Sequence, residues 1–159
     1  MLATPLAPPP FLSPSPGSAP VHEDYRLEAA DPSVEDYVRL RAEAGLSPKT
    51  PAQAAAALSG AWHTVRAVHA PSGATVGMGR IIGDGGWYFH IVDMAVLPAH
   101  QRRGIGDAIL TALLATIRRA APDTPYITLL ADPPGRPLYR RHGFVETAPR
   151  TVGMYLPRR

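Results

Sequence analysis

The apolar positions of this chain recur with two different periods, one typical of strands and one typical of helices. Period-two alternation and short apolar runs bounded by turn residues predict strands. We expect strands at residues 25–29, 62–70, 74–82, 87–97, 126–132 and 151–156. The run at 87–97 is nearly continuous, which is typical of a strand buried on both faces, and 126–132 is expected to be buried as well. Turn signals at 71–73 and 83–86 join three of these strands into hairpins.

Four segments between the strands carry helix signals instead. We expect helices at residues 31–45, from Thr50-Pro51 to Gly60, at 105–119 and at 136–143. The first has Asp31 as its N-cap, Pro32 at its first position and Gly45 at its end. The third repeats large apolar residues every fourth position. These are Ile105, Ile109, Leu113 and Ile117. The order β-α-α-β-β-β-α-β-α-β predicts a mixed sheet with helices on both sides.

Composition narrows the class of protein. The 159 residues suffice for one core, the hydrophobic fraction is 45%, and no apolar run reaches the length of a membrane span. Cysteine is absent, which excludes a disulfide, a thiolate metal site and a cysteine nucleophile, and is compatible with a cytoplasmic location. The net charge of +3 is too small to indicate a nucleic-acid partner by itself.

The start of the chain differs from the remainder. Residues 1–20 are rich in proline and carry no charged side chain, so they predict a disordered tail. They lack the basic start and unbroken apolar stretch of a signal peptide. We expect a tail at residues 1–21 and a single folded domain at 22–159.

A glycine-rich turn between the strand at 87–97 and the helix at 105–119 is the strongest local motif. The first turn of a helix has free N–H groups and a partial positive charge, and glycines let an anion approach the backbone. The sequence Gln101-Arg102-Arg103-Gly104-Ile105-Gly106 lacks the Gly-Lys-Ser/Thr ending of a Walker loop and the third glycine of a Rossmann fingerprint. It does match Gln/Arg-x-x-Gly-x-Gly/Ala at every specified position.

That turn resembles the acetyl-coenzyme A loop of the GNAT superfamily of N-acetyltransferases. A second segment, residues 137–144 (PLYRRHGF), is similar to the family's Leu-Tyr-x-x-x-Gly-Phe motif. The order of elements fits from about residue 25 to 156. The resemblance implies an α/β (α+β) fold with a mixed, mostly antiparallel sheet, flanked by helices on both sides and splayed at its fourth strand.

The resemblance also implies where the cosubstrate acetyl-CoA binds. Backbone N–H groups from Arg102 to Asp107 (Arg102, Arg103, Gly104, Ile105, Gly106, Asp107) would hold the pyrophosphate. A bulge at Met94-Ala95-Val96 would splay the strand and present backbone groups to the pantetheine and acetyl groups. The family's asparagine after the next strand is replaced by Asp132, which accepts from the pantetheine arm but cannot donate as an amide does.

Two residues take catalytic roles by the same match. Tyr139 would protonate the departing CoA thiolate, against the alternative of a core tyrosine with a satisfied hydroxyl. His90 stands six residues before Val96, where family branches carry a catalytic Glu or a His. It is the candidate general base, with a hydrogen-bonded core histidine as an equal alternative.

Other polar residues favour structural roles. Alternation places Asp93 opposite His90, so we expect Asp93 to accept from backbone N–H groups, or else to reach the site because the bulge turns it. His142 is expected to face water. His63 and His69 lack a companion ligand, so no metal site is expected.

The sequence therefore favours an acetyl-CoA-dependent N-acetyltransferase, in which the amine attacks the thioester directly in a ternary complex. A small-molecule primary amine is the expected acceptor. The alternatives are a non-catalytic CoA-binding module and an acetyltransferase acting on a protein or aminoacyl-tRNA amine. No membrane partner is expected, nucleic acid is disfavoured, and a homodimer is compatible with the sequence.

Overall fold

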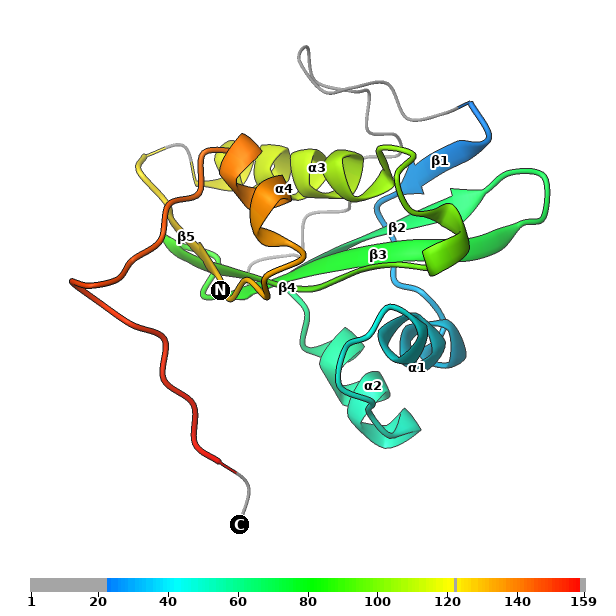
Figure 1. The fold of residues 1–159 in the computed structure, drawn as a ribbon, viewed down its shortest axis with the longest axis horizontal. Helices are drawn as coiled ribbons and strands as arrows, with labels where there is room; N and C mark the ends of the chain where they lie inside the picture. Colours follow the sequence, from blue (N-terminus) through cyan, green and yellow to red (C-terminus); the bar gives the residue numbers. More distant parts are fainter. Residues whose placement is uncertain (1–22, 122, 158–159) are drawn as a thin grey trace, which may run out of the picture.

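The computed structural model describes residues 23–121 and 123–157, which form one five-stranded sheet with helices on both faces (Figure 1). The strands are β1 (Tyr25–Glu28), β2 (His63–His69), β3 (Ala74–Gly83), β4 (Tyr88–Val96) and β5 (Tyr126–Leu129). The helices are α1 (Val34–Glu43), α2 (Pro51–Ser59), α3 (Ile105–Ala120) and α4 (Arg136–Arg141), with a 3₁₀ turn, η1, at Pro98–His100. The proline-rich tail predicted at 1–21 lies outside the described residues.

The sheet has the order β1-β2-β3-β4-β5. The first three neighbouring pairs are antiparallel, and β4 and β5 are parallel. In Figure 1, α3 and α4 lie on one face of the sheet, and α1 and α2 lie on the other. The predicted mixed, mostly antiparallel sheet is confirmed. None of the helices in the described residues is long and apolar enough to cross a bilayer.

Helix α3 supplies most of the core on its face of the sheet. The four residues of its predicted apolar stripe are all at most 1% exposed. They pack against strand residues such as Val76, Ile81 and Phe89, which are completely buried. The stripe thus fixes α3 across β2, β3 and β4, and this places the N-terminus of α3 beside the end of β4.

The helix boundaries were predicted closely, with one correction. Ser33 is the N-cap of α1, because its Oγ accepts from the backbone N–H of Asp36 at 3.0 Å, so the expected Asp31 cap is wrong. Helix α2 begins with the Thr50–Gln53 capping box and ends at Gly60, as expected.

Three strand predictions need correction. One of the two faces of β4 is only partly buried, since Tyr88 on that face is 39% exposed. Strand β5 is a half-buried edge strand that stops at Leu129. The strand expected at 151–156 is absent from the structure: these residues extend away from the sheet and are exposed (Figure 1). Within the described residues no neighbouring strand pairs with this segment, and a strand without a partner has no hydrogen-bond ladder.

Candidate active site

A bulge in β4 lies at the centre of the sheet. Met78 pairs with Ala95 and Arg80 pairs with Val92, so the single residue Gly79 faces two residues of β4, Asp93 and Met94. Asp93 has a φ of 56°, the left-handed conformation found at the first position of one common bulge type. The bulge predicted at Met94-Ala95-Val96 therefore exists but begins one residue earlier.

The bulge coincides with the place where β4 and β5 separate. Their pairing runs from Tyr88↔Tyr126 to Ile91↔Leu129, although β4 itself continues to Val96. Residues 92–96 therefore have no strand partner on the β5 side within the described part of the chain. Backbone N–H and C=O groups on that side are available to a ligand, as the resemblance implies, except the carbonyl oxygen of Val96, which accepts from Gln101 Nε2.

Gly79 provides the space into which the bulge projects. A Cβ atom at this position would lie 2.5 Å from Met94 Sδ and 2.8 Å from Ile109 Cγ2. Only glycine lets the Met94 side chain and α3 approach the strand this closely. The small residue on β3 and the bulged pair on β4 thus form one packing unit under α3.

Asp93 lies in a buried cluster of charged side chains between α1 and the sheet. Its carboxylate accepts from the Tyr37 hydroxyl at 2.6 Å and from the guanidinium groups of Arg41 and Arg80. The side chains of Asp93, Arg41 and Arg80 are only 7%, 9% and 12% exposed. Burial, and then the neighbouring Asp93 carboxylate, raise the pKa of Tyr37 above its usual value, so its hydroxyl remains a donor.

This cluster corrects the expectations for Asp93. The partners of its carboxylate are side chains rather than backbone N–H groups. The left-handed bulge turns Asp93 toward Arg80 and α1, on the side of the sheet that the register also gives to His90. The described residues contain no hydrogen bond between Asp93 and His90, so the two form no relay.

The glycine turn has the backbone conformation of an anion site. Arg102 and Gly104 have φ values of 62° and 77°, and Gly104 is the N-cap of α3. In the described part of the chain, the backbone N–H groups of residues 103–107 make no hydrogen bond. The side chains of Arg102 and Arg103 are exposed beside them. The turn therefore offers free donors and positive charge, a donor set that fits a pyrophosphate.

Two side chains tie the glycine turn to its surroundings. Gln101 donates from Nε2 to the carbonyl oxygen of Val96 at 3.0 Å, which links the turn to the end of β4. Asp107, in the first turn of α3, is 2.9 Å from His142 Nε2, and Arg141 is 3.8 Å from the same carboxylate oxygen. The expectation that His142 faces water is wrong, because its side chain is 16% exposed and paired with Asp107.

Tyr139 is held on α4 beside the end of β5. A Cβ atom at Gly135 would lie 2.9 Å from Tyr139 Cε2, so the ring packs directly on that glycine. Burial, together with the charge of Asp132, raises the pKa of Tyr139 above its usual value. Its hydroxyl makes no hydrogen bond to the described residues, so it is free to donate to a ligand.

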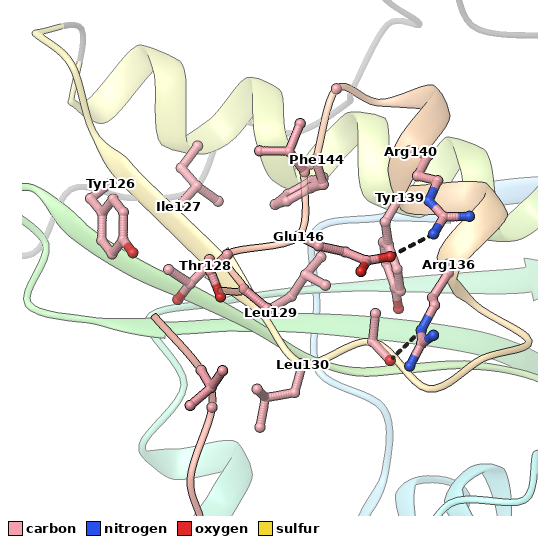
Figure 2. Close-up of a pocket in the computed structure, with 17 residues that line it drawn as sticks. Tyr126, Ile127, Thr128, Leu129, Leu130, Arg136, Tyr139, Arg140, Phe144 and Glu146 are labelled. Carbon is pink, nitrogen blue, oxygen red and sulfur yellow. Dashed lines mark hydrogen bonds and ion pairs between the residues drawn. The ribbon is translucent and has the colours of Figure 1, made fainter. Parts of the chain in front are cut away.

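Tyr139 also lines a pocket of about 480 Å³ between β5 and the chain after α4 (Figure 2). Figure 2 shows Arg136 and Arg140 on the same side, where Arg140 forms an ion pair of 2.5 Å with Glu146. Thr128 and Tyr126 line the opposite wall. The pocket thus brings polar and apolar groups around a protonated phenol.

His90 lies on β4 next to β5. Its Nδ1 is 2.7 Å from Thr128 Oγ1, and burial lowers its pKa below the usual value. Thr128 Oγ1 is also 3.4 Å from the carbonyl oxygen of Phe89. When Thr128 donates its proton to that carbonyl, it accepts from Nδ1–H, so His90 Nε2 carries the free lone pair.

The predicted residues fall into two groups. The turn at 102–107 and the bulged end of β4 lie together, joined by the Gln101–Val96 contact, and Asp132 lies close enough to Tyr139 to affect its pKa. His90 is not among the residues that line the Tyr139 pocket. Within residues 23–121 and 123–157, no three His, Asp or Glu side chains gather as a metal site would require.

The Asp93 cluster and the Asp107–His142 pair were missed by sequence reasoning. Their members are 34 or more residues apart in four of the five contacts, Arg80–Asp93 being the exception at 13. The only sequence signal for the cluster was Asp93 itself, an isolated acid in an apolar strand, since a buried carboxylate needs partners.

The known proteins that this chain resembles are all described as acetyltransferases. The model of the acetyltransferase (GNAT) domain matches residues 35–157. A probable acetyltransferase of unknown function from meticillin-resistant Staphylococcus aureus is 38% identical, with a TM-score of 0.79 over 84% of this chain and 99% of that one. A GNAT-family acetyltransferase from Streptococcus pneumoniae shares the fold at 24% identity and a TM-score of 0.68, over 85% of this chain and 98% of that one.

Among curated proteins, an uncharacterized N-acetyltransferase, ycf52, of Porphyra purpurea is 32% identical over 80 residues. This segment is 50% of the present chain and 45% of the relative, so the match spans less than half of that protein. A glucosamine-6-phosphate N-acetyltransferase from Arabidopsis thaliana shares the fold alone, at 12% identity and a TM-score of 0.65 over 85% of this chain and all of that one.

Proposed function

This chain belongs to the GNAT family of acetyltransferases, and we propose that it transfers an acetyl group from acetyl-CoA to a primary amine of a small molecule. The observation that carries the proposal is the set of free N–H groups at residues 103–107, next to the unpaired end of β4. An anion site and an open strand edge side by side suit a ligand with a pyrophosphate at one end and an amide-containing arm at the other.

Backbone groups would make most of the contacts to acetyl-CoA. The N–H groups from Arg102 to Asp107 would hold the pyrophosphate, and the exposed guanidinium groups of Arg102 and Arg103 add charge. The backbone of Met94-Ala95-Val96 would bind the pantetheine arm and the acetyl carbonyl. Asp132 would accept a hydrogen bond from the same arm. Acetyl-CoA supplies the activated acyl group as a thioester.

The amine acceptor must reach the acetyl carbonyl as a free base. His90 is suited to take its proton, directly or through a water, because its lowered pKa keeps the imidazole neutral at pH 7. Thr128 would orient the ring, and Nε2 would be the acceptor in the tautomer that carries its proton on Nδ1. Backbone N–H groups at the bulge would stabilise the tetrahedral oxyanion.

Collapse of that intermediate releases a thiolate, which needs a proton. The Tyr139 hydroxyl is the candidate donor, since burial and Asp132 keep it protonated and no described residue accepts its hydrogen bond. The chain contains no cysteine to form an acyl-enzyme by a thiol, and we favour direct attack in a ternary complex. Holding both substrates in one cleft supplies much of the rate.

The deciding experiment is a thiol-release screen with acetyl-CoA across classes of amine. We expect turnover with at least one small primary amine, and we expect treatment with EDTA to leave the rate unchanged. Tight CoA binding without turnover on any amine would instead support a non-catalytic CoA-binding module. Turnover confined to protein or aminoacyl-tRNA amines would overturn the small-molecule assignment. A cytoplasmic location stays a prediction.

A further inference from the structure

Helix α4, which carries Tyr139, is held on the molecule by few contacts. None of its six residues is fully buried. The chain before it contains Pro133-Pro134, and residues 145–157 after it are all exposed. An element with so few buried contacts opens easily unless directional contacts hold it. The place of the Tyr139 hydroxyl in the site therefore depends on what fixes this helix.

One face of α4 rests on the first turn of α3. Leu138 and His142, the C-cap of α4, are four residues apart, so they lie on the same side of the helix. A Cβ atom at Gly106 would lie 3.6 Å from Leu138 Cδ2, and His142 Nε2 is 2.9 Å from Asp107 Oδ1. This face of α4 thus lies against the turn that would bind the pyrophosphate.

Tyr139 projects from a different side of the same helix. It follows Leu138, and successive residues of a helix are turned by about 100° about its axis. A Cβ atom at Gly135 would lie 2.9 Å from Tyr139 Cε2, and the ring centroids of Tyr139 and Phe144 are 6.1 Å apart. A rotation of α4 on α3 would therefore carry the hydroxyl away from its present place in the pocket (Figure 2).

The hydrogen bond of His142 is the contact that fixes this rotation. The Leu138 contact is apolar and has no preferred direction, whereas a hydrogen bond weakens steeply when its geometry changes. Arg141 contributes little, because its nitrogen is 3.8 Å from the Asp107 carboxylate and its side chain is 63% exposed. The side chains of His142 and Asp107 are only 16% and 20% exposed, so water competes little for their contact. Within the described residues, His142 therefore makes the one short polar contact between α4 and α3.

We propose that His142 is a positioning residue for acetyl transfer, and that it holds Tyr139 in place through Asp107. This inference rests on the proposed function, in which Tyr139 protonates the departing thiolate. Asp107 serves both partners, because its backbone N–H belongs to the turn that would bind the pyrophosphate and its carboxylate binds the helix of the proton donor. The thioester and the phenol are thereby placed relative to one common residue. Rates are sensitive to such placement, since a shift of about 1 Å costs as much as about 10²-fold.

The first test is a kinetic cycle of variants at positions 142 and 139. His142→Leu fills a similar space and removes the hydrogen bond, so we expect kcat to fall by about 10- to 100-fold while KM for acetyl-CoA hardly changes. His142→Gln keeps a donor that reaches Asp107 and should restore most of kcat. In the Tyr139→Phe background, which has no phenolic proton to place, His142→Leu should cause no further loss.

The matched control is His69→Leu, which removes the bond between His69 and Ser72 at the end of β2, a strand that β3 and β4 separate from β5. It should leave kcat unchanged. If Tyr139→Phe lowers kcat, equal losses from His142→Leu in both backgrounds, or no loss in the wild-type background, overturn the positioning role and leave the acid role intact. An unchanged kcat in Tyr139→Phe refutes the acid role and, with it, the positioning that we propose.

The second test needs no turnover. Tyrosine labelled with carbon-13 at Cζ gives one NMR signal for each of the six tyrosines, and the signal of Tyr139 is the one missing in Tyr139→Phe. Burial, and then the charge of Asp132, raise the pKa of Tyr139 in the present arrangement. We expect this pKa to fall toward about 10 in His142→Leu and to stay raised in His142→Gln and in His69→Leu. The same pKa in His142→Leu and in the wild type refutes the positioning even when no amine is acetylated. Absence of turnover together with the expected pKa values refutes the proposed function alone.

Discussion

The Tyr37 hydroxyl of α1 donates a 2.6 Å hydrogen bond to Oδ2 of Asp93, the residue that begins the bulge in β4. Because Arg41 of α1 and Arg80 of β3 bind the same carboxylate, one side chain joins three elements at the point where β4 leaves β5. The left-handed backbone of Asp93 is thus held by contacts on the far side of the sheet from α3. The opening that we assign to acetyl-CoA depends on this cluster.

Replacing Asp93 by asparagine tests that dependence. Asparagine keeps the shape of the side chain and tolerates the left-handed conformation, so the change removes only the charge between two buried arginines. We expect a loss of roughly 3–5 kcal/mol in the free energy of unfolding, measured with urea, because breaking a buried ion pair leaves an uncompensated charge. Glu28→Gln removes the partner of the half-exposed Arg26 and Arg66, and should cost at most about 1 kcal/mol. Equal losses in the two variants would contradict the role of the Asp93 cluster.

The pH dependence of the rate tests His90 as the base. Burial lowers its pKa, so the imidazole is neutral above that value and charged below it. The rate should therefore rise with pH on an acid limb that lies below about pH 6.5, and then stay level. His90→Gln should lower the plateau by about 10²-fold or more and remove the limb.

A stability effect could produce a similar limb, and His63 provides the control. Its pKa is also lowered, chiefly by burial, and it lies on β2. A buried histidine with a lowered pKa favours folding above its unfolded pKa, and this stability is lost as the pH falls below about 6.5. His63→Gln should relieve that loss and keep the kinetic limb. If His63→Gln abolishes the limb and His90→Gln does not, His90 is not the base.

The sequence predicted the parts of the site that depend on neighbours along the chain. The glycine turn and the stripe on α3 are local patterns, so Gly104 and Ile105 were placed correctly at the start of that helix. The predicted position of the bulge was wrong by one residue. The actual position depends on the space at Gly79 and on the contact with Tyr37, which no local pattern in the sequence indicates.

The remaining errors have a related physical cause. His142 meets Asp107 across 35 positions, and neither residue carries a local sign of the other. For residues 151–156, alternation indicates which side chains share a face, but it does not say which edge the strand will join. The prediction of a strand at 151–156 was therefore wrong for the described chain.

Gly104 offers a test of the anion site with a closely matched control. Its φ of 77° costs roughly 1–2 kcal/mol for any residue with a Cβ, so Gly104→Ala should strain the turn and misalign its N–H groups. We expect CoA to bind about tenfold more weakly by titration calorimetry, the loss of about one charge-assisted hydrogen bond. Gly45 has a φ of 82° and open space around it, so Gly45→Ala carries the same strain away from the turn. CoA affinity that falls equally in both variants would make the effect one of general stability.

Tyr139→Phe separates proton donation from donor binding. The ring would still pack on Gly135 and Phe144, so CoA affinity should hardly change, whereas the thiolate would leave without a proton. We expect kcat to fall by about 10²- to 10⁴-fold, the usual contribution of a general acid. Tyr126→Phe removes a hydroxyl from the same pocket on an exposed ring, and should leave kcat unchanged. Because the pKa of Tyr139 is raised, the hydroxyl stays protonated beyond pH 10, so the wild-type rate should show no basic limb from this group up to that pH. An unchanged kcat in Tyr139→Phe would remove the residue from the mechanism, and water or another group would have to protonate the thiolate.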